Sequence, residues 1–199
     1  MVVKQFWLKK NIICTDRIYE ALEKFNDTDV DLVMNLQGDE PLMNIEDIRN
    51  LNDQMIKNQF QLGTLASIIR DKKIYNNQNI VKVETKNKLN SSNFPEATNF
   101  FREISEESKN IYHHLGIYCY QKNTLENFVS LNQSSNELKN KLEQLRALDN
   151  SIKINVALAI SSPIGVDTEE DFVAIKKIME YKSWWKKFIF KELSVHIRI

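Results

Sequence analysis

The sequence predicts an α/β fold, with a mostly parallel sheet that carries helices on both of its faces. Short apolar runs of strand length alternate along the chain with amphipathic helical patterns, which is the order that crossover connections between parallel strands produce. The 199 residues are enough for one domain with a sizeable core. No internal repeat or low-complexity linker breaks the pattern, so we expect a single α/β unit.

The first half of the chain supplies two helical patterns and three strand patterns. Thr15 opens the first helix, in which Ile18, Ala21, Leu22 and Phe25 fall on one face. The expected elements are a helix over 15–25, a strand over 30–36, a turn over 37–41, a helix over 45–56 and strands over 64–69 and 80–84. In such sheets ligands bind beyond the carboxyl ends of the strands, so the turn over 37–41 is a candidate site.

The second half continues the alternation. The expected elements are a long polar loop over 85–110, a strand over 115–120, a short helix over 124–129, a helix striped by leucines 138, 142, 145 and 148, a strand over 152–160 and a helix after Thr168. Thr168 to Asp171 is a capping-box start, and Phe172, Ile175 and Met179 follow on one helix face. The segment 165–171, between a strand and a helix, is a second candidate site.

Composition excludes several classes of protein. There are 27 Lys and Arg against 27 Asp and Glu, and this zero net charge argues against a general nucleic-acid binder. Cys14 and Cys119 cannot build a disulfide framework, which favours the cytoplasm. The apolar runs are too short for a membrane span, and lysines interrupt any signal-peptide core near Met1. We therefore expect a cytoplasmic protein with no nucleic-acid partner and no membrane span.

Two aspartates follow predicted strands and could share a metal ion. Asp39 and Asp167 offer hard oxygen ligands, which is what Mg²⁺ on a nucleotide phosphate needs. The local pattern alone favours a simpler interpretation, in which Asp39 forms a turn and Asp167 belongs to a helix cap. No Walker A, GxGxxG, GxSxG or HExxH pattern is present, so the enzymes that those motifs mark lose their best support.

A few other polar residues also allow two interpretations. His113 and His114 precede a strand, where a histidine can bind substrate or act as a base but is more often structural. Glu143, Gln144 and Arg146 lie on the leucine-striped helix, where the simpler interpretation is a solvated face.

Four strings occur in an order that is familiar. They are VMNLQGDEP at 33–41, HLGIY at 114–118, LEQLR at 142–146 and GVDTEED at 165–171. Together they resemble the bacterial sugar-acid cytidylyltransferases that act on 3-deoxy-manno-octulosonate (Kdo). Thr15 to Arg17 and Asn79 to Val83 fit two further segments of that family, and the likeness covers about 15–182.

The resemblance implies a Rossmann-like nucleotide-diphospho-sugar transferase fold, here lacking its first strands. It implies a partial cytidylyltransferase domain over 15–182, with a dimerisation region at about 64–160 and therefore a homodimer. Residues 1–14 and 183–199 match nothing in the family. The aromatic and basic end of the chain allows contact with a membrane surface or a partner subunit, and the simpler expectation is a loosely packed end.

The resemblance also implies a reaction. The family couples CTP to Kdo, an eight-carbon sugar acid, and releases pyrophosphate for lipopolysaccharide biosynthesis. Positioning and charge neutralisation do most of the work in such a transfer. The implied roles are metal binding and catalysis for Asp39 and Asp167, sugar binding for His114, Tyr118, Glu143, Gln144 and Arg102, a bridge between nucleotide and sugar for Gln37, and nucleotide binding for Arg17.

Some family features are missing. The basic loop that cradles the triphosphate, of the type PAR…RLP…KPL, does not occur, and residues 1–13 stand in its place. We therefore expect an N-terminally truncated member that is weakly active or inactive, because much of the electrostatic stabilisation would be lost. Two alternatives stay open: a cytidylyltransferase for another sugar acid, such as 8-amino-Kdo or a nonulosonic acid, and a non-catalytic dimerising fragment.

Overall fold

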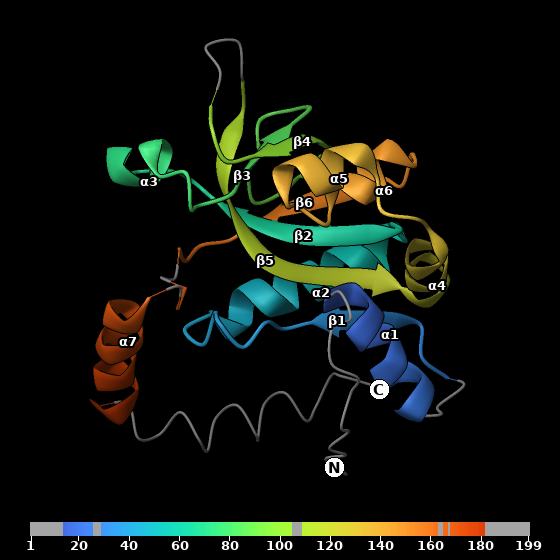
Figure 1. Ribbon diagram of the computed structural model, residues 1–199, viewed down its shortest axis with the longest axis horizontal. Helices are drawn as coiled ribbons and strands as arrows, with labels where there is room; N and C mark the ends of the chain where they lie inside the picture. Colours follow the sequence, from blue (N-terminus) through green and yellow to red (C-terminus); the bar gives the residue numbers. More distant parts are fainter. Residues whose placement is uncertain (1–13, 26–28, 105–108, 163–164, 167, 182–199) are drawn as a thin grey trace.

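One mixed sheet organises the part of the chain that the structure describes. The computed structural model describes residues 14–25, 29–104, 109–162, 165–166 and 168–181 (Figure 1). Within them the sheet has the strand order β4-β3-β5-β2-β6, and β1 also pairs with β5. The strands are β1 (Leu32–Asn35), β2 (Leu62–Ser67), β3 (Lys82–Thr85), β4 (Ala97–Phe101), β5 (Ile111–Gln121) and β6 (Ile154–Leu158).

The helices of the described residues lie between or beside these strands. They are α1 (Cys14–Phe25), α2 (Ile45–Asn58), α3 (Lys72–Asn76), α4 (Lys122–Ser130), α5 (Ser135–Asn140), α6 (Leu145–Asp149) and α7 (Glu169–Tyr181). Asn44 caps α2 by accepting a hydrogen bond from the backbone of Glu46. In this part of the chain no helix is both long and apolar enough to cross a membrane.

Strand direction differs from the sequence-based expectation. Among the described strands only β2 and β6 run parallel, whereas β5 runs antiparallel to β1, β2 and β3, and β4 runs antiparallel to β3. The prediction of a mostly parallel sheet is therefore wrong for the described strands. An apolar run indicates that both faces of a strand are buried, and β5 is buried on both faces although it is antiparallel.

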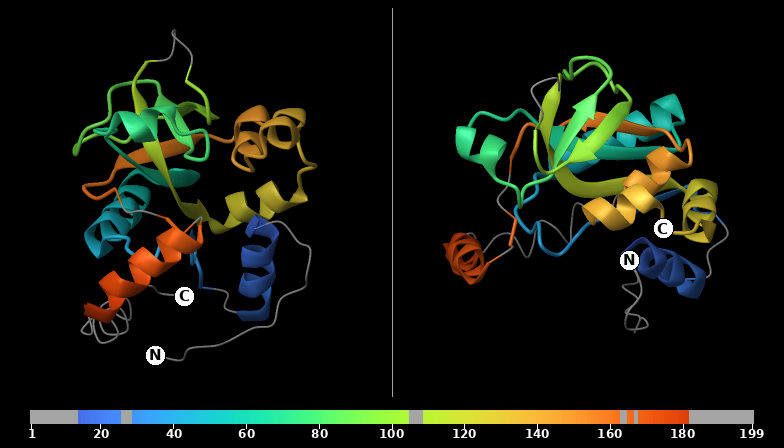
Figure 2. Two further views of the ribbon diagram at one scale, coloured as in Figure 1. Left: turned by 60° about the vertical axis from the view of Figure 1, so that its left-hand side comes forward. Right: turned by 45° about the horizontal axis from the view of Figure 1, so that its top comes forward.

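The prediction of helices on both faces is confirmed (Figure 2). Ile117 and Cys119 of β5 belong to one core cluster, which also contains Leu51 and Met55 of α2. Their neighbours Tyr118 and Tyr120 belong to the other cluster, which includes or contacts residues of α1, α4 and α6. Alternate side chains of β5 thus point to opposite faces of the sheet, one of which is covered by α2. The candidate site lies on the other face.

Most predicted elements are confirmed with shifted boundaries, but three features differ. The expected loop over 85–110 contains β4, which pairs with β3. The short helix α3 is absent from the sequence-based reading. The single leucine-striped helix is in fact two, because Lys141 ends α5 in the left-handed region with a φ of 54°. A leucine stripe can be shared by two short helices when the chain turns between them.

Candidate active site

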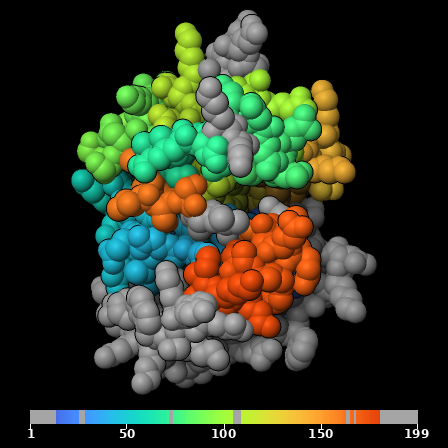
Figure 3. All heavy atoms as spheres, turned by 90° about the vertical axis from the view of Figure 1, so that its left-hand side faces the viewer, coloured from blue at the N-terminus to red at the C-terminus, as the bar shows by residue number. Residues whose placement is uncertain are grey.

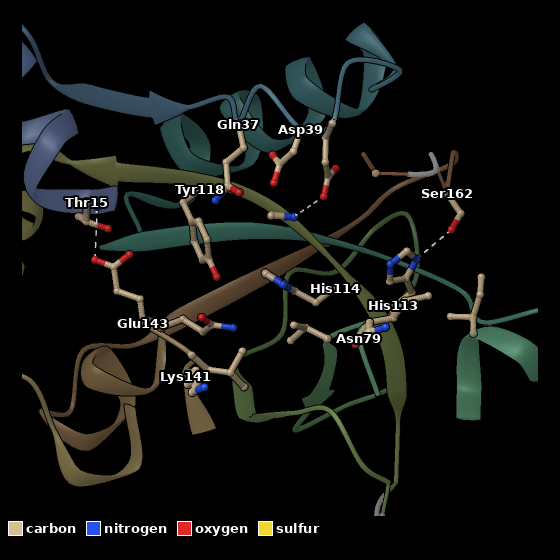
Figure 4. Close-up of a pocket in the computed structure, with 18 of the residues that line it drawn as sticks. Thr15, Gln37, Asp39, Asn79, His113, His114, Tyr118, Lys141, Glu143 and Ser162 are labelled. Atoms are coloured by element: carbon tan, nitrogen blue, oxygen red, sulfur yellow. Dashed lines mark hydrogen bonds between the residues drawn. The ribbon is translucent and has the colours of Figure 1, made fainter. Parts of the chain in front are cut away.

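A pocket of about 440 Å³ opens beside the middle of β5 (Figure 4). Its lining comes from segments that are far apart in the sequence, which include the turn after β1, the loop before β3, the strand β5, the loop between α5 and α6, and residues after β6. Six of the predicted site residues line it: Gln37, Asp39, His114, Tyr118, Glu143 and Gln144. The fold therefore brings together side chains that are up to about a hundred positions apart.

Three predicted residues lie elsewhere or cannot be placed. Arg17 is exposed on α1 and does not line the pocket. Arg102 also lies outside the lining, and its guanidinium donates to the backbone carbonyl of Asn79 at 2.7 Å. Asp167 lies outside the described residues. Arg102 thus holds a loop of the pocket in this structure rather than facing the cavity.

The turn after β1 presents Asp39 at the pocket. Its side chain is exposed, and its backbone carbonyl accepts a hydrogen bond from the Val166 N–H at 2.8 Å. Gly165 lies beside the same carbonyl. The residues just before position 167 are therefore bound to the backbone of Asp39.

A glycine in β5 allows the Gln37 side chain to cross the strand. A Cβ atom at Gly116 would lie 3.1 Å from Gln37 Oε1, which is tighter than ordinary contact. The Gly116 N–H also donates to Glu40 Oε1 at 3.0 Å. Close approach is one of the reasons that a position requires glycine, and here it brings the turn after β1 onto β5.

His114 is a buried, neutral hydrogen-bonding group. The Thr64 hydroxyl donates to the carbonyl of Ile117 at 2.7 Å, so its oxygen accepts from His114 Nε2, 3.0 Å away. This arrangement puts the ring proton on Nε2. Burial, with a smaller contribution from His113, lowers the pKa of His114 to about 3. The imidazole is therefore uncharged at neutral pH.

Tyr118 and Glu143 add further polar groups to the same face. Burial raises the pKa of Tyr118 well above its ordinary value, so its hydroxyl keeps its proton. Glu143 Oε1 accepts from the Thr15 N–H at 3.3 Å, at the start of α1, and burial raises the pKa of this carboxyl group. The pocket therefore presents neutral ring groups beside a carboxylate, a combination that suits the hydroxyl groups of a sugar.

An ion pair supports the loop that carries Glu143 and Gln144. Arg146 donates from Nε and Nη2 to the two carboxylate oxygens of Glu137, at 2.8 and 2.5 Å. The two side chains are only 2% and 5% exposed. Arg146 also lies over the Phe128 ring, 4.7 Å from its centroid. The predicted solvated role of Arg146 is therefore wrong, because this residue is a core anchor between α5 and α6.

The loop before β3 is held by two basic side chains. Lys82 Nζ donates to the carbonyls of Asn77 at 2.5 Å and Arg102 at 2.8 Å, and Arg102 in turn holds Asn79. Burial, with a contribution from Arg102, lowers the pKa of Lys82. The sequence-based reading missed Lys82, because a lysine within a strand pattern gives no sign that it is buried. His113 and Ser162 also line this end, and their side chains lie 3.0 Å apart.

The charges of the described lining are mostly negative. Asp39, Glu40, Glu143 and Asp171 supply carboxyl groups, whereas Lys141 is the cationic side chain among the described lining residues. An anionic ligand in this pocket would therefore need added positive charge. Among the described residues no group of three or more His, Cys, Asp or Glu could hold a metal ion. Asp39, which is exposed at the pocket, is one described carboxylate that could hold a metal ion together with ligand oxygens.

The fold defines a class of protein. The structure of this chain is similar to that of apo UDP-glucose pyrophosphorylase, with a TM-score of 0.60 at 9% identity over 88% of this chain and 63% of that one. A CMP-2-keto-3-deoxy-manno-octonic acid synthetase complexed with CTP matches with a TM-score of 0.72 at 27% identity, over 84% of this chain and 68% of that one. The fold is therefore that of the nucleotidyltransferases of the diphospho-sugar type, and the predicted α/β fold class is confirmed.

Sequence comparison gives the family. The family model described as cytidylyltransferase matches residues 13–154. The 3-deoxy-manno-octulosonate cytidylyltransferase of Thermodesulfovibrio yellowstonii is 42% identical over 175 residues, covering 83% of this chain and 69% of its own length. That of Afipia carboxidovorans is 38% identical over 170 residues, covering 83% and 67%. The chain belongs to the cytidylyltransferase family, among relatives of the 3-deoxy-manno-octulosonate type, and the predicted resemblance is confirmed.

Proposed function

We propose that the pocket takes part in cytidylyl transfer from CTP to Kdo. In this reaction the anomeric hydroxyl of the sugar acid attacks the α-phosphorus, the bond to the β-phosphate breaks, and pyrophosphate leaves. The products are CMP-Kdo and pyrophosphate. The observation that carries the proposal is the convergence of six side chains on one pocket in a chain of this family.

The proposed binding roles follow from the chemistry of the lining. His114 and Tyr118 are neutral at physiological pH and exchange hydrogen bonds with sugar hydroxyl groups. Glu143 accepts from further hydroxyl groups, and Gln37, which lies across Gly116, can both donate and accept. These groups orient the sugar so that its anomeric hydroxyl faces the nucleotide.

Magnesium is part of the proposal. CTP and Kdo are both anions, and the described lining is mostly negative, so the substrates need a divalent cation to lie beside these carboxylates. Asp39 is the proposed ligand on the described side, and the Val166 hydrogen bond to its carbonyl supports Asp167 as the second one. A bound magnesium ion would neutralise charge on the phosphate and the sugar carboxylate.

A coupled assay tests the proposal. Pyrophosphate release is measured with CTP, Kdo and Mg²⁺, with each omitted in turn, and Kdo binding is measured separately by calorimetry. We expect slow release that needs all three components and a loss on the order of 100-fold in Asp39→Asn. Asp31→Asn is the matched control, because Asp31 is exposed next to β1 and does not line the pocket.

The other outcomes separate the alternatives. Binding of Kdo without pyrophosphate release would indicate a non-catalytic fragment. Faster release with 8-amino-Kdo or a nonulosonic acid would change the substrate but keep the reaction. Neither binding nor release with any of these acids would refute the proposal. A homodimer and a cytoplasmic location stay predictions, and light scattering of the purified chain tests the first.

A further inference from the structure

Asp47 is a buried carboxylate on α2 that lies outside the pocket lining. Its side chain is 1% exposed. Oδ1 accepts from the Ile160 N–H at 2.8 Å, and Oδ2 accepts from the Ser161 N–H at 3.1 Å and the Ser161 hydroxyl at 2.5 Å. Near it on α2, Asn50 donates to the carbonyl of Leu158 at 3.2 Å. One helix thus fixes the end of β6 and the residues that follow.

We call residues 160–162 and 165–166 the connector, since they belong to the segment that leads from β6 to α7. Figure 3 shows the segment after β6, in orange, at the surface between α2 and α3. The Ile160 side chain is 81% exposed, and Ser162 is exposed as well. Apolar burial therefore does little to hold this part of the connector. The hydrogen bonds to Asp47 fix the backbone at Ile160 and Ser161.

The connector meets the pocket at two points. The Ser162 hydroxyl lies 3.0 Å from His113 Nδ1 at one end of the cavity. The Val166 N–H donates to the carbonyl of Asp39 at 2.8 Å. Both contacts lie downstream of the residues that Asp47 holds. A shift of the connector at Ile160 and Ser161 would therefore move both sides of the pocket.

We propose that Asp47 is a positioning residue for this pocket. By holding the connector it keeps Ser162 against His113 and Val166 against Asp39 before any ligand arrives. Three donors converge on the buried carboxylate, and bonds to a charged acceptor are stronger than neutral ones. The inference rests on the proposed function in one respect, since it takes Kdo as the ligand of the pocket.

The variant Asp47→Asn tests this role by hydrogen exchange, without any substrate. Asparagine keeps the shape of the side chain, removes the charge and replaces one acceptor by a donor that faces Ser161. We expect the Ile160 and Ser161 amides to exchange at least about tenfold faster, the ratio that loss of one bond to a charged group gives. We expect Val166 to exchange faster too. Its partner is Asp39, so this change reports positioning rather than loss of a local contact.

Two further variants make the measurement decisive. Asp53→Asn is the matched control, because Asp53 is exposed on the same helix, and it should leave all three amides unchanged. Ser161→Ala removes the hydroxyl bond alone and should give the same pattern with a smaller change, even where Asp47→Asn fails to fold.

Kdo binding supplies the second measurement. We expect the affinity measured by calorimetry to fall about tenfold in Asp47→Asn. The inference would be overturned if the Val166 amide of Asp47→Asn exchanged as slowly as that of the unmodified protein. It would also be overturned if this amide exchanged faster while the Kdo affinity of the variant stayed unchanged. If the unmodified protein binds no Kdo, the proposed function fails, while the Val166 amide still decides whether Asp47 positions the connector.

Discussion

Replacing Arg146 by methionine should destabilise the fold strongly, because it leaves the Glu137 carboxylate buried without its main partner. Removing one member of a buried ion pair typically costs about 3–5 kcal/mol. Glu137 keeps hydrogen bonds from the Ser134 N–H at 3.1 Å and the Gln133 side chain at 3.2 Å. We therefore expect the lower end, about 3 kcal/mol of unfolding free energy, or roughly 6–12 °C in Tm for a domain of this size.

Urea unfolding followed by circular dichroism measures this change, and two variants control it. Adding Glu137→Leu to Arg146→Met removes the stranded charge and should recover most of the loss. Lys153→Met breaks the pair with Glu96, whose side chains are 65% and 36% exposed, and should cost less than about 1 kcal/mol. A loss below about 1 kcal/mol in Arg146→Met, or a double variant no more stable than the single one, would refute the reasoning.

Three other substitutions test the site and the core. Gly116→Ala should displace the Gln37 side chain and weaken Kdo binding, measured by calorimetry, about tenfold with little change in Tm. The control is Gly38→Ala, whose methyl group meets nothing within 4 Å and should leave the Kdo affinity unchanged. Gly63→Ala should lower the free energy of unfolding in urea by about 1–3 kcal/mol, because the new Cβ would lie 2.6 Å from Met55 Sδ. An unchanged free energy of unfolding would show that the core relaxes freely around the added methyl group. Burial lowers the pKa of His114 from 6.5 to about 3. Between pH 6.5 and about pH 3 this residue is therefore protonated in the unfolded chain and neutral in the folded protein. Stability should therefore fall as the pH drops through that window, by about 1.4 kcal/mol per unit from this residue, and His114→Gln should remove that share; identical pH dependence in both proteins would contradict the assignment.

Local patterns predicted most elements of the fold. The helical period of α1 and the apolar runs of β1, β2 and β6 are features that each segment carries by itself. The strand β4 was missed because its burial alternates irregularly and its partner β3 lies in a separate part of the pattern. Strand direction was wrong for the same kind of reason, since pairing depends on the path of the whole chain.

The candidate site divides in a similar way. The family strings predicted Gln37, His114 and Glu143, and these residues do line one pocket. The family strings gave no indication that Arg102 donates to the backbone carbonyl of Asn79, because the direction of a long side chain depends on its tertiary neighbours. The position of Asp167 lies outside the described residues, so its predicted metal role stays a prediction.

The sequence by itself determined most of the segments that become helices or strands, the family that the chain resembles and the side chains that are candidates for chemistry. Only the tertiary structure decided that β5 is antiparallel to its three partners and that Arg146 is buried against Glu137. It also decided that Asp47 anchors the residues after β6. The physical reason is that periodicity and propensity act over a few residues, whereas burial of a charge and its hydrogen-bond partners depend on segments that meet only when the chain is folded.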